Sequence, residues 1–522
     1  MSAHAAHTSP VPEGCPAPIV LTKAGRFLSF PVGCGETLHR LDIDCDGKPY
    51  TELLVPDGES LYRAAVLLPD ECRTLALHGA FSPAFAAGIG FCAGLDAPAA
   101  GLPLAHYAPP QGWCNDPNGL ICEKGQYLFY YQYNPCGTKW NNMSWGAAST
   151  KDFLHWETQP AVLLPDARGS VFSGCGIRNE HALLGLPADA LLYFYTAAGQ
   201  AYECADKTAL WSAGKPFTQN WAYSLDGGRT IVRPEHNELI GDLGCGARDP
   251  KVFWYAPKGY YCMVLFLDGN RFELRHSADL LHWEKTQELE LPGSWECPDL
   301  FPLPAPDGGE KWVFWSADGY YYLGDFDGEY YHTDCVRHLA YRTALPYAAQ
   351  TWSGTVPRVL SIPWMRTKNP GRSFTGLYGV PREFSLVQTS AGLTLCQRPA
   401  AEFAAALHAE ASLASGEAWH TESEQAIFLH TATRDAVPVK WTLYGSCYAY
   451  DPRSGVFSGE GAQFYLAPAL TDFTLIFDRG ILELTAAHDT LFAAVETDCY
   501  TLSGDVCVEG DTAHTRLCTP SL

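Results

Sequence analysis

Residues 149–157 read STKDFLHWE, and residues 277–284 read SADLLHWE. Ser149 begins one copy and Ser277 the other, and an Asp, a Phe or Leu, and then Leu-His-Trp-Glu follow in the same order. A weaker third copy, SLDGGRT, starts at Ser224. Repetition within a strand-rich chain is typical of a β-propeller, whose blades each repeat one antiparallel sheet. At the usual blade size, the stretch 104–392 would hold about five blades. The alternative is a chance match in an aromatic-rich chain.

The sequence around the repeat predicts an all-β fold. Gly (48) and Pro (37) recur throughout, and long segments with apolar residues at helical spacing are scarce. Short aromatic-rich runs are separated by turn residues, as antiparallel strands are. The clearest runs are YLFYYQY (127–133), LLYFYTA (191–197), KVFWYA (251–256), YYCMVLFL (260–267) and KWVFWSA (311–317).

A chain of 522 residues is too long for one compact core, and four regions are predicted. Residues 1–102 form a small N-terminal β-rich module, 103–395 the five-bladed β-propeller, 396–419 an Ala-rich linker with helical character, and 420–522 a C-terminal β-sandwich. In the first region, LHRLDIDCDGKPY (38–50) predicts a hairpin that turns at Asp46-Gly47. An EF-hand loop starting at Asp42 would require an acid where Leu53 stands, so the hairpin is preferred.

Charge and composition exclude several kinds of partner. The formal net charge of -23 would repel nucleic acid and anionic membrane surfaces, which attract clustered Lys and Arg. No run approaches the roughly 20 apolar residues of a spanning helix. The N-terminus has neither a cationic start nor an apolar core segment, so a signal peptide is not expected. A cytoplasmic protein with a neutral small-molecule ligand fits these observations.

The 19 cysteines are odd in number, scattered and never spaced as Cys-x-x-Cys. Reduced thiols in a cytosol explain this pattern more simply than a disulfide framework does. The same scatter disfavours a structural zinc site, so we expect no metal.

Three short acidic motifs lie inside the predicted propeller. They are WCNDPNG (113–119), ARDPKVFW (247–254) and SWECPDLF (294–301). Each alone has an ordinary structural explanation, such as a turn or the start of a strand. Together they place three carboxylates next to strands of different blades, where they can converge on the propeller axis. Cleavage of a glycosidic bond needs such a set, with one carboxylate facing the anomeric carbon and a second, protonated acid reaching the leaving oxygen.

The three motifs resemble the signature set of glycoside hydrolase family 32, which includes invertases, inulinases, levanases and fructan exohydrolases. The resemblance implies that Asp116 is the nucleophile, that Asp249 stabilises the transition state, and that Glu296 is the acid and base. It covers roughly residues 104–400 well and continues weakly into the C-terminal sandwich. Supporting segments are YYQYNP (130–135), WG (145–146), FSG (172–174), YAAQTW (347–352), VLSIPWM (359–365) and GVPREFSL (379–386).

The same resemblance implies a fructose-binding subsite, which is lined by Asn115, Gln132, Trp140, Phe172, Ser173, Arg248 and Trp364. Amides, a hydroxyl and a guanidinium suit a polyol, and aromatic faces suit its C–H surface. Core packing for the aromatic residues and strand surface for Gln132 and Ser173 remain the alternatives. Three positions depart from the family pattern: Cys114 replaces Met, Cys175 replaces Ser, and Ala147 replaces His. Cys297, in contrast, belongs to that pattern and need not act as a nucleophile or metal ligand.

The predicted activity is therefore that of a retaining β-fructofuranosidase that removes terminal fructose from sucrose or fructans. No cofactor is required. A five-bladed glycosidase acting on arabinose or xylose is one alternative, and a non-catalytic fructan-binding protein is another. The sequence does not distinguish sucrose from sucrose phosphate or from fructan ends, and the oligomeric state is unreadable from it.

Overall fold

The computed structural model describes residues 17–95, 101–199 and 210–520. Within these ranges the regular structure is strand, apart from two short helices, α1 (Pro83–Ala87) and α2 (Ala401–Ala405). The predicted all-β class is confirmed. In the described ranges, no helix combines the length and the apolar character needed to cross a bilayer.

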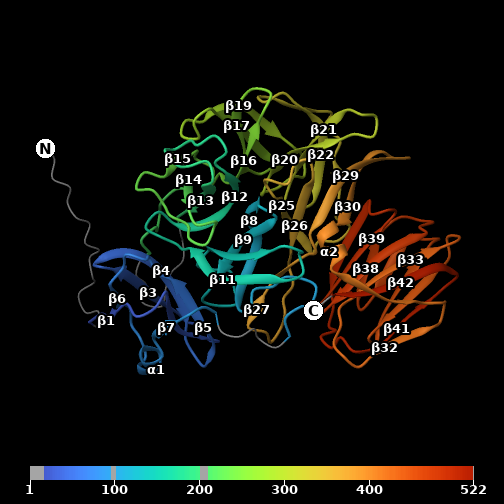
Figure 1. The fold of residues 1–522 in the computed structure, drawn as a ribbon, viewed down its shortest axis with the longest axis horizontal. Helices are drawn as coiled ribbons and strands as arrows, with labels where there is room; N and C mark the ends of the chain where they lie inside the picture. The colour runs from blue at the N-terminus through green and yellow to red at the C-terminus, as the bar shows by residue number, and fades with distance from the viewer. Residues whose placement is uncertain (1–16, 96–100, 200–209, 521–522) are drawn as a thin grey trace.

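Five antiparallel sheets form the propeller, which lies between the N-terminal module and the C-terminal sandwich in Figure 1. The first blade consists of β8 (Gly112–Glu123), β9 (Gln126–Asn134), β10 (Ser144–Thr150) and β11 (Trp156–Leu163). The second blade consists of β12 (Ser170–Arg178), β13 (Leu191–Ala198), β14 (Thr218–Ser224) and β15 (Glu238–Ile240). The third blade consists of β16 (Arg248–Tyr255), β17 (Tyr260–Asp268), β18 (Arg271–Ser277) and β19 (Glu284–Glu290). The fourth blade consists of β20 (Asp299–Pro304), β21 (Glu310–Trp315), β22 (Tyr320–Phe326), β23 (Tyr331–Thr333) and the added β24 (His338–Leu339). The fifth consists of β25 (Pro346–Thr351), β26 (Val359–Met365), β29 (Arg382–Thr389), β30 (Gly392–Pro399) and the added β28 (Leu377–Tyr378).

The repeated sequence forms the same turn in blades 1, 2 and 3, between the third and the fourth strand. Asp152 and Asp279 each accept hydrogen bonds from the backbone N–H groups two and three residues later, at 2.8 to 3.0 Å. In the third copy the Asp accepts from the N–H groups three and four residues later, both at 3.0 Å. The bonds to Asp152 and Asp279 define Asx-type turns, and the Asp226 turn is a related one without the bond from the second residue. The supporting hydroxyl comes from Ser277 in blade 3 but from Thr150 in blade 1, so the pairing of Ser149 with Ser277 is wrong by one residue.

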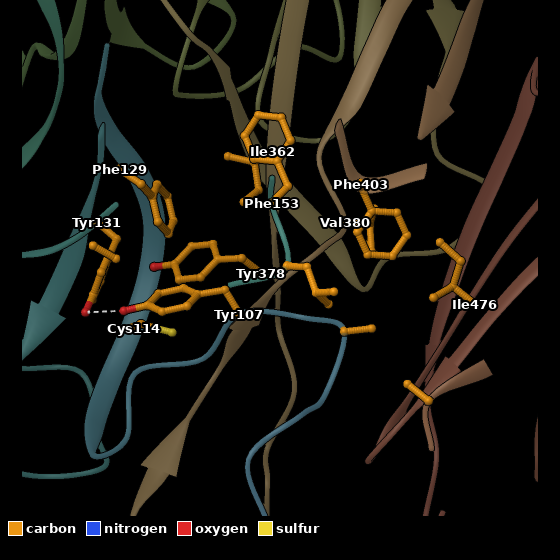
Figure 2. Packing of buried hydrophobic residues seen from close by; sticks show 14 of the residues in the cluster. Tyr107, Cys114, Phe129, Tyr131, Phe153, Ile362, Tyr378, Val380, Phe403 and Ile476 are labelled. Atoms are coloured by element: carbon orange, nitrogen blue, oxygen red, sulfur yellow. Dashed lines mark hydrogen bonds between the residues drawn. The ribbon is translucent and has the colours of Figure 1, made fainter. Parts of the chain in front are cut away.

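The ring of blades is closed by contacts between blade 1 and blade 5. The short strand β27 (Phe374–Thr375) pairs in parallel with β8, and Tyr107 forms a β-bridge with Tyr378. Figure 2 shows the aromatic cluster behind this closure: Tyr107 stacks on Tyr378 and donates or accepts a 3.1 Å hydrogen bond with the Tyr131 hydroxyl. Phe129 packs edge-on against Tyr378. Burial of these large rings holds the first and last blades together.

The C-terminal β-sandwich consists of two six-stranded sheets, which lie at the red end of Figure 1. One contains β31 (Leu407–Ser412), β42 (Thr512–Pro520), β33 (Ile427–Thr433), β38 (Asp472–Asp478), β39 (Ile481–Ala486) and β40 (Leu491–Glu496). The other contains β32 (Ala418–Thr421), β41 (Gly504–Glu509), β34 (Val439–Leu443), β35 (Ser446–Asp451), β36 (Val456–Gly459) and β37 (Ala462–Tyr465). The predicted linker at 396–419 differs from the structure, because it holds the end of β30, helix α2, strand β31 and the start of β32. An Ala-rich composition lowers strand propensity but does not prevent a strand where a partner is available, here β42 for β31 and β41 for β32.

The N-terminal module has two sheets. One contains β1 (Ile19–Thr22), β6 (Thr74–His78), β3 (Leu38–Cys45) and β4 (Lys48–Pro56), and the β3–β4 pairing confirms the hairpin at Asp46-Gly47. The other, formed by β5 (Ser60–Leu67), β2 (Phe27–Gly33) and β7 (Gly90–Cys92), continues the sheet of blade 1, because β5 pairs in parallel with β11. The sequence predicted a separate N-terminal module, but in the structure the module shares a sheet with blade 1 of the propeller. The other region boundaries remain predictions.

Candidate active site

The first strands of blades 1, 2, 3 and 5 share one irregularity. These strands lie against one another in the middle of the propeller. Each has a register shift, between Cys114 and Pro117 in β8, Val171 and Gly174 in β12, Arg248 and Lys251 in β16, and Tyr347 and Gln350 in β25. A bulge turns side chains out of the regular alternation and often adjoins an active site. In β8 and β16 a Pro, which has no N–H for the ladder, directly follows the motif Asp. Pro250 lies inside its bulge, and Pro117 lies at the end of its bulge, where it pairs with Tyr131.

Asp116 lies within the bulge of β8. Its Oδ2 atom accepts a 2.7 Å hydrogen bond from the Ser173 hydroxyl and is 3.5 Å from the Cys297 thiol, which is placed to donate to it. Burial raises the pKa of Asp116, the Ser173 hydrogen bond lowers it, and the nearby Glu296 carboxylate raises it again. Two donors therefore hold one oxygen of a carboxylate that would otherwise be poorly solvated.

Asp249 is 3% exposed and lies within the bulge of β16. Its Oδ2 atom accepts a 3.1 Å hydrogen bond from the Cys297 backbone N–H and lies 3.6 Å from the Cys297 thiol. Burial raises the pKa of Asp249 to about 7; Arg248 opposes this effect, and the Glu296 and Asp116 carboxylates add to it. Burial also keeps the pKa of the Cys297 thiol well above its ordinary value. The neutral thiol thus lies between Asp116 and Asp249, where its single proton is donated to one of the two carboxyl groups at a time.

Glu296 lies in the segment that connects blades 3 and 4, between β19 and β20. Its Oε1 atom accepts a hydrogen bond of 2.5 Å from Arg248, and its Oε2 atom accepts one of 2.8 Å from the Tyr347 hydroxyl. The Glu296 side chain is 25% exposed, more than Asp249 at 4%. The three acids therefore converge from blades 1 and 3 and from the blade 3–4 connection, joined through Cys297 and Arg248.

Several residues at this convergence have a left-handed backbone. The φ angle is 64° at Asp249, 47° at Glu296, 42° at Cys297 and 51° at Ala348. Non-glycine residues adopt this region at a cost of order 1–3 kcal/mol each, and such residues gather at functional sites. The surrounding blades hold these residues in place, since the carbonyl groups of Trp295 and Glu296 both accept from the N–H of Ala317.

Residues 106–399, more than half of the chain, match the description "Glycosyl hydrolases family 32 N-terminal domain". The chain belongs to glycoside hydrolase family 32. It is 33% identical to a levanase of Bacillus subtilis over 336 residues, which cover 58% of this chain and 47% of the levanase. It is 32% identical to an invertase of Debaryomyces hansenii over 298 residues, 52% of this chain and 53% of the invertase. The chain thus spans about half the length of these relatives.

Solved structures of family 32 members share the fold. An exo-inulinase from Aspergillus awamori superposes with a TM-score of 0.67 at 20% sequence identity, covering 80% of this chain and 98% of that one. A fructofuranosidase from Schwanniomyces occidentalis, complexed with fructosylnystose, gives a TM-score of 0.67 at 21% identity, covering 82% and 99%. The propeller followed by a sandwich is therefore the architecture of family 32 in this chain as well.

Among the residues predicted to bind sugar, the polar ones lie at different distances from the acids. Ser173 and Arg248 contact Asp116 and Glu296 directly. Asn115 is held by a 2.9 Å hydrogen bond from the Trp113 indole to its Oδ1, and its amide lowers the pKa of Asp116. Gln132 is 2% exposed, and its Nε2 donates to the Val171 carbonyl at 2.9 Å. The described contacts do not join Gln132 to the acids.

The three aromatic residues flank the acids in two groups. Trp140 packs edge-on against Phe172 at a centroid distance of 6.0 Å, and Phe172 directly precedes Ser173. Trp364 packs edge-on against Trp113 at 6.0 Å and against Tyr347 at 6.2 Å. The Trp364 indole N–H is buried without a hydrogen-bond partner. The roles of all ten predicted site residues remain predictions, although nine of them form one connected cluster.

Two contacts of this cluster were not predicted as part of the site. Tyr347 donates to Glu296, and Trp113 orients Asn115. A signal for both was present, because Tyr347 begins the family 32 segment YAAQTW and Trp113 begins WCNDPNG. A hydrogen bond between residues 51 positions apart in the chain is nevertheless not readable from either motif.

The departures from the family 32 pattern have packing roles at two positions. The Cys175 sulfur accepts a 3.0 Å hydrogen bond from the Val252 N–H and so joins blades 2 and 3. Cys114 is fully buried in the aromatic cluster of Figure 2. All 17 cysteines in the described part of the chain are free thiols. Across that same part, no set of three or more His, Cys, Asp or Glu side chains is arranged to hold a metal ion.

Proposed function

We propose that the chain is a retaining β-fructofuranosidase that hydrolyses terminal fructose from sucrose or fructo-oligosaccharides. The observation that carries the proposal is the connected set of Asp116, Asp249 and Glu296, held at the bulged inner strands of a family 32 propeller. Fructose-releasing activities are also what the names of the related levanase and invertase state of those proteins.

In the first half of the reaction, Asp116 attacks the anomeric carbon of the fructose residue. Because both donors described above bind Oδ2, we assign the attack to Oδ1. The bond from the anomeric carbon to the leaving oxygen breaks while Glu296 transfers a proton to that oxygen. The product of this step is a fructosyl ester on Asp116.

In the second half, water attacks the same carbon and Glu296 accepts a proton from it. The ester bond breaks, Asp116 is released as a carboxylate, and the configuration of the fructose is retained. Asp249 binds sugar hydroxyl groups throughout. With a pKa of about 7, it is able to donate as well as accept near neutrality. A retaining reaction requires the Asp116 and Glu296 carboxyl groups to lie about 5–5.5 Å apart.

The roles of the acids are tested by single substitutions. Asp116→Asn should lower kcat/KM for sucrose by about four to six orders of magnitude, as loss of a nucleophile does. Glu296→Gln should lower it by about two to four orders of magnitude. Azide should partly restore turnover in Glu296→Ala by acting as an external nucleophile. The matched control is Glu284→Gln, a carboxylate that is 82% exposed in the same propeller and should leave turnover unchanged. Full activity in either active-site variant would remove that residue from its role.

The covalent intermediate gives a separate test of retention. Glu296→Gln incubated with a fructoside that has a good leaving group should accumulate a fructosyl adduct on the peptide containing Asp116, detected by mass spectrometry. Inverted configuration of the first product, measured by NMR, would contradict the mechanism.

The substrate is tested with a panel of sucrose, sucrose phosphate, kestose, inulin and levan, with an aryl arabinoside included. Fructose release from at least one fructoside is expected. Cleavage of the arabinoside alone would favour the arabinose-type alternative, and absence of any cleavage would favour a binding protein. The cytoplasmic location is likewise a proposal, which cell fractionation would test.

A further inference from the structure

Strand β4 of the N-terminal module is an edge strand that faces the propeller. It pairs with β3 on one side only. Glu52, Leu54 and Pro56 occur at every second position, and all three contact propeller loops, as residues with the same orientation in a strand do. An edge strand presents unpaired N–H and C=O groups that a neighbouring segment can bind. A Pro at its end, which lacks an N–H, is typical of such an edge.

Asn142, in the loop between β9 and β10 of blade 1, binds this edge at two points. Its Oδ1 accepts from the Leu54 N–H at 2.8 Å, and its Nδ2 donates to the Leu54 carbonyl at 2.8 Å. The amide thus pairs with β4 as a neighbouring peptide group would. Asn142 is 2% exposed and has a φ of 45°, and its Nδ2 also donates to Asn134 at 2.9 Å. All of these bonds are buried, which makes each costly to lose.

The other end of the same loop is held by Tyr62 of strand β5. The Tyr62 hydroxyl donates to the Pro135 carbonyl at 3.2 Å and accepts from the Gly137 N–H at 2.7 Å. Pro56 lies next to Gly137: a Cβ atom added to Gly137 would lie 3.4 Å from the Pro56 ring, which is van der Waals contact. The module therefore fixes both ends of the segment 135–142.

The Glu52 side chain extends this contact to blade 2. Its Oε1 accepts from the Trp211 N–H at 2.7 Å, and Leu210 is buried in one cluster with Leu54. The chain then leads to Phe217, whose ring packs edge-on against Phe172 at 5.4 Å. Strand β4 thus contacts both the loop that carries Trp140 and the segment that leads to Phe217, and these two rings both pack on Phe172.

Between the two anchor points of the blade 1 loop lies Trp140, which packs on Phe172 beside Ser173 and Asp116. We infer that the N-terminal module, through the β4 edge that binds Asn142 and through Tyr62 of β5, is a positioning element for the active site that sets where the Trp140 ring lies and so controls the affinity for the sugar substrate. The inference rests on the proposed fructosidase function. Asn142 and Tyr62 touch no acid, so they act on substrate binding through Trp140 and not on the chemical step.

The test compares two tyrosine variants of the module. Tyr62→Phe removes only the hydroxyl that holds the loop and should raise KM for sucrose or kestose about three- to fivefold, with kcat changed less than twofold. Asn142→Ala should raise KM about tenfold. The matched control is Tyr50→Phe, whose hydroxyl donates to the Leu67 carbonyl within the module at 2.7 Å and should leave KM unchanged. In a Trp140→Ala background, Tyr62→Phe should have no further effect, because coupled residues are not additive.

Hydrogen exchange provides a readout that does not depend on activity. Amides of residues 136–142 should exchange faster in Tyr62→Phe and Asn142→Ala than in the wild type and in Tyr50→Phe. An unchanged KM in an active Tyr62→Phe enzyme, or an equal KM effect with and without Trp140, would overturn the inference. A wild-type protein that cleaves no fructoside would instead contradict the proposed function. In that case, exchange in this loop that is equal in the wild type, Tyr62→Phe and Asn142→Ala would overturn the positioning contact by itself.

Discussion

The propeller is flanked by two modules that are joined to it by opposite kinds of contact. The C-terminal sandwich is joined by buried charges: His106 lies 3.1 Å from Asp478 and 3.3 Å from Glu483, and all three side chains are fully buried. Arg382 of blade 5 pairs with Glu483 from the other side. The buried contacts of the N-terminal module with the blade 1 loop are instead made by neutral groups, namely the Asn142 amide on a strand edge and the Tyr62 hydroxyl. Among the described residues, its charged contacts with the propeller are the Glu52 carboxyl group, which accepts from the Trp211 N–H, and a largely exposed ion pair between Glu36 and Lys139.

Because the two contacts differ in charge and in the segments they reach, we expect the sandwich contact to affect mainly stability and the N-terminal contact to affect mainly substrate binding. Buried charges are expensive to leave unpaired, so the sandwich contact resists any change in one partner. Its hydrogen bonds run to the segments of Leu104–His106 and of Val380, which carry no predicted site residue. Neutral contacts cost less when lost, but those of the N-terminal module end on the loop that holds Trp140. We therefore expect substitutions in the sandwich contact to change stability, and substitutions that remove the contacts of Asn142 or Tyr62 to change KM.

The largest effect is expected from Arg382→Met. Arg382 is 2% exposed and its partner Glu483 is 0% exposed, so the variant leaves a buried carboxylate with one cation fewer. The loss in unfolding free energy should be about 3–5 kcal/mol, measured by thermal or urea unfolding. Arg271→Met is the control, because this arginine is 42% exposed and solvent screens its ion pairs with Asp268 and Glu288, so the unfolding free energy should change little. KM of the folded variant should be unchanged; a raised KM would break the separation.

An intermediate effect is expected from pH. Burial opposes a charge on His106, but hydrogen bonds to Asp478 and Glu483 raise its pKa to about 9 from an ordinary value of 6.5. The stabilisation is therefore fully present below about pH 6.5 and is lost as the pH rises to about 9, a change on the order of 3 kcal/mol. Unfolding midpoints at intervals across this range would measure the slope. His106→Gln should abolish most of it, and an equal slope in that variant would assign the effect elsewhere.

The smallest effect is expected from Glu52→Gln in the N-terminal contact. Burial raises the pKa of Glu52 to about 7 from 4.5, so the folded state holds a proton that the unfolded chain has already lost in this range. The wild type thus loses stability as the pH rises from about 4.5 to 7, whereas a Gln needs no proton. Relative to the wild type, the variant should gain about 1 kcal/mol over this range, after allowance for the lost pairing with Arg40. KM should stay constant, because an amide oxygen still accepts from the Trp211 N–H.

Much of the fold was predictable because it depends on local sequence. The repeat predicted blades since an Asx turn is built from neighbouring residues, and Asp152 and Asp279 form it without distant partners. The hairpin at Asp46-Gly47 was predictable for the same reason. The linker was not, because whether an Ala-rich segment forms an edge strand depends on the partner it meets, here β42 for β31. The pairing of β5 with β11 likewise joins positions almost a hundred residues apart.

The site divides in the same way. The convergence of the three acids was predictable because each lies in a short motif, and the Asp-Pro and Glu-Cys sequences of these motifs fall at a bulge or at a connection between blades; their catalytic roles stay predictions. Tyr347 and Asn142 were not, because their importance comes from partners far along the chain, Glu296 and Leu54. A sequence motif shows only the neighbours of a residue along the chain, whereas Tyr347 and Asn142 act through contacts with residues that are distant in sequence and close in space.

The pairing of β5 with β11 also bears on how this chain is divided for experiments and how it evolved. The family 32 match begins at residue 106, which invites trimming there. Such a cut would uncover the outer edge of blade 1 and leave a bare strand open to intermolecular pairing. The trimmed protein would be prone to aggregate however well its catalytic acids were preserved. For the same reason, loss of this module in a relative would expose the outer strand of blade 1 unless another segment covered it.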